Sequence, residues 1–123
     1  MTIDPRRRAE ATAIFKLGMK ADQAGVHRTL NRPPKGKGWI QGHNMPPGLM
    51  IRPEKVREAI VHYERAYAIF PDIVALNQIA IAYEMLGEVE AARERFTAMS
   101  EQGEREGFAA YVKAAEMALE RLK

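Results

Sequence analysis

The fold is decided by residues 73–106, IVALNQIAIAYEMLGEVEAARERFTAMSEQGERE, within a chain of 123 residues. Apolar residues recur here at spacings of three and four, first before and then after Gly87. This spacing is typical of amphipathic helices that bury one face. Asp72 precedes the first run as an N-cap candidate, and Gly87 follows it as a stop signal. We therefore expect two antiparallel helices over 73–86 and 88–102, joined by a tight turn.

Three further segments show the same helical spacing. Asp4 and Pro5 suit the N-cap and first position of one helix, and Pro53 can open a second. Gly103 is expected to end the helix over 88–102, and the third segment follows it. No segment shows the alternation of a strand. The sequence thus predicts a single all-α domain of about five helices, in which the three added helices span residues 4–25, 54–70 and 107–122.

Residues 26–53 form a segment of different composition. It contains no acidic residue and five of the seven prolines, which predicts a long irregular loop. Three alternatives stay open. The apolar residues Trp39 and Leu49–Ile51 pack on the helices and complete the core, or the segment is a binding arm, or it is disordered. In the binding arm, Trp39 is the anchor and basic side chains steer an acidic partner, namely Arg28, Arg32, Lys35 and Lys37.

Residues 73–106 resemble a tetratricopeptide repeat in the order of their small and large residues. The residues that carry the resemblance are Leu76, Ile79, Ala80, Tyr83, Gly87, Ala92, Phe96 and Met99. One family period upstream, about 34 residues, the second helix of a preceding repeat is matched by Ala59, Tyr63, Ala66 and Pro71. Its first helix is matched by Ile14, Leu17, Gly18, Ala21 and Gly25. The resemblance implies a right-handed array of helix pairs, in which the 26–53 segment is an insertion into the first repeat and 107–122 is a closing helix.

Arrays of this family leave a concave groove lined by the first helix of each pair. The resemblance places in this groove Phe15, Met19, Val74, Asn77, Gln78, Ile81, Glu84 and Met85. One subgroup of the family clamps a C-terminal carboxylate with basic and amide side chains. The matching positions here are mostly apolar, so the resemblance implies an apolar or amphipathic segment of a partner protein as the ligand.

The residues that most often carry catalysis or bind metals are few and scattered. The chain has no cysteine, and His27, His43 and His62 lack metal-ligand spacing. Ser100 is the only serine and has no histidine near it in sequence, so a serine nucleophile is not indicated. We therefore expect no enzymatic activity, no cofactor and no metal.

The charge is distributed unevenly along the chain. Residues 1–55 carry a net charge of +7 and residues 56–123 a net charge of −4. This asymmetry has two interpretations. Either the two halves attract one another, within the fold or between copies, or the basic half forms a patch for an acidic partner. No run of apolar residues is long enough to span a membrane. The N-terminus lacks the apolar stretch of a signal peptide. The methionine-rich, cysteine-free composition fits the cytoplasm.

These patterns together predict a cytoplasmic protein-protein interaction module that serves as an adaptor, scaffold or chaperone-like subunit. Its expected partner is another protein or a peptide segment, and a second copy of the chain is a further candidate. The alternative is an accessory protein that binds nucleic acid or an acidic partner through the basic N-terminal half. The acidic C-terminal half makes nucleic acid the less favoured partner.

Overall fold

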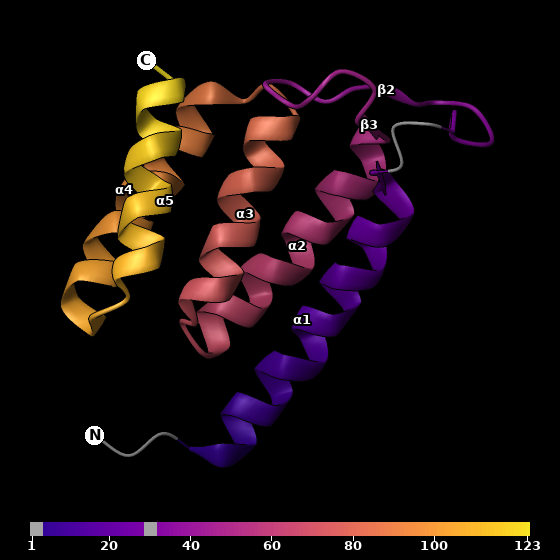
Figure 1. Ribbon diagram of the computed structural model, residues 1–123. Coiled ribbons are helices and arrows are strands. Elements are labelled where there is room, and N and C mark those ends of the chain that lie inside the picture. Colours follow the sequence, from indigo (N-terminus) through magenta and orange to yellow (C-terminus); the bar gives the residue numbers. More distant parts are fainter. Residues whose placement is uncertain (1–3, 29–31) are drawn as a thin grey trace.

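The computed structural model describes residues 4–28 and 32–123 of the chain. In this part of the chain there are five helices, which run alternately up and down so that consecutive helices are antiparallel (Figure 1). The prediction of an all-α fold with about five helices is confirmed. The helices are α1 (Pro5–Gly25), α2 (Pro53–Ile69), α3 (Ile73–Met85), α4 (Val89–Glu106) and α5 (Ala109–Arg121).

The first helix pair is held together by one close contact. The ring of Tyr63, on α2, lies directly on the backbone of α1 at Gly18, where an added Cβ would be only 2.6 Å from two ring carbons. Tyr63 is buried, and Ala21 of α1 and Ile79 of α3 pack around it. Its ring also packs against Phe15, with a centroid distance of 5.1 Å. Tyr63 therefore joins the first three helices.

The 26–53 segment contains a small antiparallel sheet. Its strands are β1 (Val26–His27), β2 (Ile40–Gln41) and β3 (Met50–Ile51), in the order β1-β3-β2. The expectation of a loop without strands is wrong at these positions. Each strand has two residues, which is too short for the alternating pattern that identifies a strand in a sequence.

The sheet returns the chain to the place from which it left α1. Val26 pairs with Ile51 across the two strands, and the Arg52 N–H donates to the Gly25 carbonyl at 2.8 Å. The segment therefore begins and ends at one point, so it interrupts the α1–α2 pair in sequence without separating the two helices in space.

The later part of the 26–53 segment packs on the helices. Ile51 is fully buried in a cluster with Val56 of α2 and Met85 of α3. The segment reaches over the end of α3 (Figure 1), where the His43 N–H donates to the Met85 carbonyl at 2.9 Å. Of the three alternatives for the 26–53 segment, packing on the helices to complete the core is therefore the one that holds for Leu49–Ile51. Residues 29–31 of this segment lie outside the described residues.

The fourth helix does not end where the sequence suggested. It continues through Gly103 to Glu106, and Gly107 ends it with a φ of 80°. Gly103 is buried against α5, because a Cβ there would lie 2.7 Å from Val112 Cγ2 and 3.3 Å from the Phe108 carbonyl oxygen. The glycine allows the two helices to approach each other and does not stop α4.

This packing predicts the effect of Gly103→Ala. Helix propensity alone would stabilise the protein by up to about 1 kcal/mol, but crowding against Val112 is expected to cost about 1–3 kcal/mol. We expect a net loss in the free energy of unfolding, measured by urea denaturation. Val112→Ala removes the side chain that crowds residue 103. In that background, Gly103→Ala should therefore lower the free energy of unfolding by less. A Gly103→Ala variant more stable than the wild type would contradict this helix contact.

Candidate binding groove between α1 and α3

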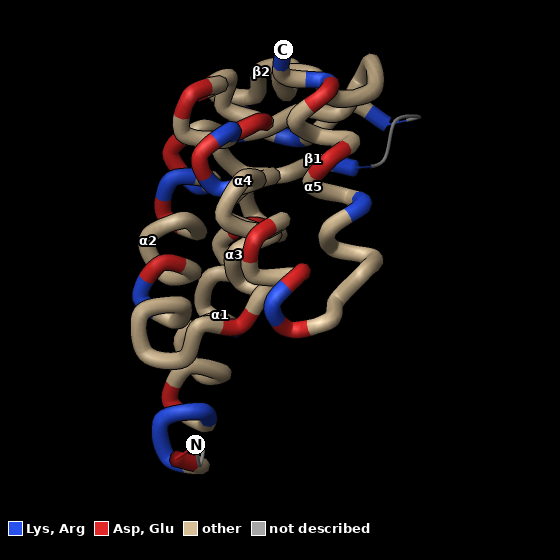
Figure 2. Tube along the Cα trace, turned by 90° about the vertical axis from the view of Figure 1, so that its left-hand side faces the viewer, with Lys and Arg blue, Asp and Glu red and all other residues tan. Residues whose placement is uncertain are grey.

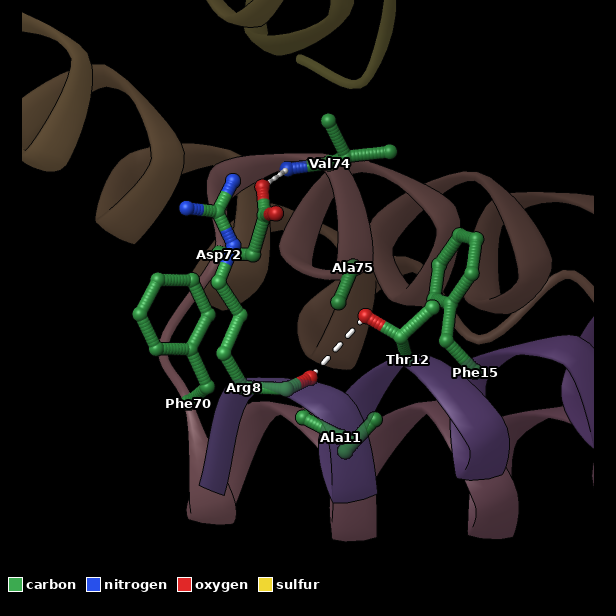
Figure 3. Close-up of a pocket in the computed structure, with 9 residues that line it drawn as sticks. Arg8, Ala11, Thr12, Phe15, Phe70, Asp72, Val74 and Ala75 are labelled. Carbon is green, nitrogen blue, oxygen red and sulfur yellow. Dashed lines mark hydrogen bonds between the residues drawn. The ribbon is translucent and has the colours of Figure 1, made fainter. Parts of the chain in front are cut away.

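A cavity of about 230 Å³ lies between α1 and the start of α3 (Figure 3). Its wall is mainly apolar, and the polar side chains that line it come from the N-terminal half of α1 and from the N-cap of α3. The apolar residues are Ala11, Phe15, Ala66, Phe70, Val74 and Ala75, and the polar ones are Arg8, Thr12 and Asp72.

A second, more open hollow of about 680 Å³ adjoins the first, and Arg8, Phe70 and Asp72 line both. It extends toward the turn between α4 and α5, where Phe108 is 45% exposed. We refer to the two hollows together as the α1–α3 groove. The remaining residues of the second hollow are Asp4, Arg7, Ile69, Pro71, Ile73 and Glu106.

The turn between α2 and α3 forms one edge of the groove and is held from two sides. The Val74 N–H donates to Asp72 Oδ1 at 2.9 Å, which caps α3. Gln102 of α4 is buried, and its amide donates to the Pro71 carbonyl at 2.8 Å while its oxygen accepts from the Tyr67 hydroxyl at 2.6 Å. Burial raises the pKa of the Tyr67 hydroxyl above its ordinary value.

The first turns of α1 form the opposite edge. The Arg6 N–H donates to Asp4 Oδ1 at 2.9 Å and so caps the helix. Thr12 donates its hydroxyl hydrogen to the Arg8 carbonyl at 2.9 Å, so this hydrogen is already used within α1. Phe15 is oriented by its packing on Tyr63. The wall on this side is therefore set by the contact between α1 and α2.

Basic side chains concentrate at this end of α1. Figure 2 shows the first turn of the helix as a run of basic positions near the N-terminal end of the described chain. In residues 4–28 and 32–123, Arg6, Arg7 and Arg8 take part in no ion pair within 4.0 Å. The Arg8 guanidinium lies over the ring of Phe70, 5.5 Å from its centroid. The groove therefore combines an apolar wall with an arginine at the junction of its two hollows.

Only two of the eight groove residues implied by the repeat resemblance line this groove. These are Phe15 and Val74. Met19 is 41% exposed on α1 but lines neither hollow, and Asn77 and Gln78 are half-buried on α3 outside them. The open part of the groove thus lies nearer to the start of α1 than the resemblance implied.

Of the other three implied residues, two are buried and one is half-buried. Ile81 is half-buried between two core clusters, and Met85 is buried under the 26–53 segment. Glu84 is fully buried, and its carboxylate accepts from Arg121 Nε at 2.8 Å and Nη2 at 2.7 Å, and from Asn44 Nδ2 at 3.4 Å. The hydrogen bonds between Arg121 and Glu84 raise the pKa of the Arg121 guanidinium. Glu84 and Met85 are therefore corrected from groove residues to internal ones.

The candidate contacts on the 26–53 segment lie apart from the groove, and none of them lines either hollow. Arg28 pairs with Asp22 at 3.2 Å. The Trp39 ring is stacked against Arg52, whose guanidinium carbon lies 4.5 Å from the ring centroid. Arg52 also donates to the carbonyls of Lys35 and Lys37, both at 3.2 Å. Arg32, Lys35 and Lys37 are exposed.

Sequence reasoning missed most residues of the groove wall, although some signals were present. Arg8 lies in the N-terminal half, for which only the summed positive charge was considered. Ala11 continues the apolar stripe of Ile14, Gly18 and Ala21 by one helical step. Asp72 was recognised as a cap, which does not indicate that its turn also forms the edge of a cavity.

Comparison of the chain with protein-family models, with curated proteins and with solved structures finds no match in any of the three. Within residues 4–28 and 32–123, no helix is sufficiently long and apolar to cross a membrane. Over the same residues, no group of three or more His, Asp or Glu side chains is placed to hold a metal ion.

The Glu84–Arg121 pair predicts a specific stability effect. Arg121→Met would leave a buried carboxylate without its guanidinium partner, which should lower the free energy of unfolding by about 2–4 kcal/mol. The matched control is Lys113→Met, an exposed residue of the same helix, which should change stability by less than about 0.5 kcal/mol. Equal effects of the two substitutions in urea denaturation would show that the pair does not hold α5 to α3.

Proposed function

We propose that this protein is a protein-protein interaction module of the tetratricopeptide-like type, which binds an apolar or amphipathic segment of a partner in the α1–α3 groove. The observation that carries the proposal is the apolar wall of Phe15, Phe70 and Val74, which is open at the surface of a folded helical domain. Val74 is 37% exposed. Open apolar hollows of this kind are a common feature of binding sites.

The proposed binding mode is the insertion of a partner's apolar side chain between α1 and α3. The helix cap at Asp72 and the hydrogen bonds of Gln102 hold one edge of the groove in place before binding. A preorganised edge reduces the entropy that binding would otherwise cost. An adaptor, scaffold or chaperone-like role in the cytoplasm is compatible with such a site, since each requires binding of a segment without a reaction.

A second candidate is binding of an acidic partner by the 26–53 segment. Arg52 stacks on Trp39 and holds the carbonyls of Lys35 and Lys37, and this leaves the two lysine side chains exposed. Binding there would depend on charge and would weaken steeply with added salt. The apolar groove should be much less sensitive, so the salt dependence separates the two candidates.

The test compares two valine substitutions. Val74→Glu places a charge in the groove, whereas Val61→Glu places the same charge on α2 at a residue that is 57% exposed and lines neither hollow. Purified protein is screened against a displayed library of random heptapeptides. We expect the wild type and Val61→Glu to retain the same peptides and Val74→Glu to lose at least about tenfold in affinity, because the buried charge opposes an apolar ligand.

Circular dichroism and urea denaturation establish that both variants are folded. Full retention of the peptides by folded Val74→Glu would exclude the groove as the site. If the wild type retains no peptide at all, the proposed interaction module itself is contradicted.

A further inference from the structure

Arg8 occupies a distinctive position in the groove. It lines both hollows, and its side chain extends beside Phe70 toward Asp72 (Figure 3). The guanidinium lies over the Phe70 ring, 5.5 Å from the centroid. An arginine packed on an aromatic ring keeps its charge and retains donors at its edge. Arg8 is therefore placed to bind an acceptor on any segment that fills the apolar cavity.

The two aspartates that line the second hollow together with Arg8 already have backbone partners. Asp4 Oδ1 accepts from the Arg6 N–H, and Asp72 Oδ1 accepts from the Val74 N–H, each at 2.9 Å. Neither forms an ion pair with Arg8 within 4.0 Å. Residues 1–3 and 29–31 contain no Asp or Glu, so these undescribed residues cannot supply an acidic side chain.

We infer that the α1–α3 groove recognises a protein segment in which an Asp or Glu lies within about two residues of an apolar side chain. The apolar side chain fills the cavity beside Phe15 and Val74, and the carboxylate binds Arg8. This inference rests on the proposed function and specifies its ligand. Arginine and carboxylate match in geometry, because two parallel N–H donors of the guanidinium can meet the two carboxylate oxygens.

The charges around the groove favour one carboxylate over a polyanion. The second hollow is lined by Arg7 and Arg8 but also by three acidic residues, Asp4, Asp72 and Glu106. A nucleic-acid backbone would place several phosphates against these carboxylates, and like charges repel. A segment with a single acidic side chain beside Arg8 meets less of that repulsion and still gains the apolar contact. The structure therefore favours an acidic-apolar protein segment.

The experiment uses the full chain and a displayed library of random heptapeptides. Peptides that the wild type retains should be enriched in Asp or Glu within two positions of Leu, Ile or Phe. The tightest of them is synthesised, together with a version in which the acid is replaced by its amide. For the acidic peptide, Arg8→Glu should raise the Kd at least about tenfold, as expected for loss of a charge-assisted hydrogen bond.

Arg6→Glu is the matched control. It makes the same change in net charge as Arg8→Glu, next to Arg7 in sequence, but Arg6 lines neither hollow. It should change the Kd by less than about threefold, since exposed charges act weakly at a distance in salt. Asp72→Asn retains a good helix cap and removes a competing negative charge, so it should bind the acidic peptide more tightly. The amide version of the peptide should lose affinity for the wild type but not for Arg8→Glu.

Three outcomes would overturn the inference. Retained peptides without enrichment in acidic residues would show that the groove binds apolar segments alone, which leaves the proposed function intact. Equal effects of Arg8→Glu and Arg6→Glu would show that only net charge matters. Enrichment of acidic peptides that survives Val74→Glu would place the acidic site outside the groove, on the 26–53 segment.

Discussion

The arrangement of this molecule depends on the contact between Tyr63 and Gly18. No residue larger than glycine fits beneath the ring, since the position of a Cβ at residue 18 is 2.6 Å from two ring carbons. Burial raises the pKa of the Tyr63 hydroxyl, and the nearby Asp22 carboxylate raises it further. An aromatic side chain of this size can contribute several kcal/mol when it is fully buried, on the order of 3–5 kcal/mol by the cost of removing it.

This one contact explains how two helices can pair across a long interruption. The 26–53 segment leaves α1 at Gly25 and comes back at Arg52, where a backbone hydrogen bond closes the excursion. Such a closed excursion adds little strain to the helix pair, and the entropy cost of a longer loop grows only slowly with its length. The same contact orients Phe15 through Tyr63. The groove wall is thus a consequence of how α1 is held on α2.

The helices could be predicted from the sequence because their apolar spacing and their caps agree. Asp4 and Asp72 cap helices as expected, and both signals are local. Features that depend on a distant neighbour could not be predicted in this way. Gly103 has the local signature of a helix end, and only the approach of Val112 from the next helix reveals its role. Leu17 was matched to the first helix of a repeat but is 50% exposed, because Gly18 provides the contact with Tyr63.

The candidate site shows the same division. Phe15 and Val74 were identified because the repeat resemblance places them on the inner face of their helices, and both line the groove. Glu84 was placed on that face too, but its partners Arg121 and Asn44 come from regions distant in sequence and enclose it. Arg8 was missed for the opposite reason, since its packing partner Phe70 is distant in sequence and lies just after the end of α2. Charge and spacing indicate which side chains can bind, whereas packing decides which ones are open.

The most direct test of the account is an NMR titration of the ¹⁵N-labelled wild-type chain with the tightest peptide from the random library. If the α1–α3 groove is the binding site, the largest amide shift changes should fall at Ala11 and Phe15 on α1 and at Val74 and Ala75 on α3. Largest changes along Lys35–Ile40, with the groove amides unmoved, would contradict the account and transfer the binding site to the basic segment.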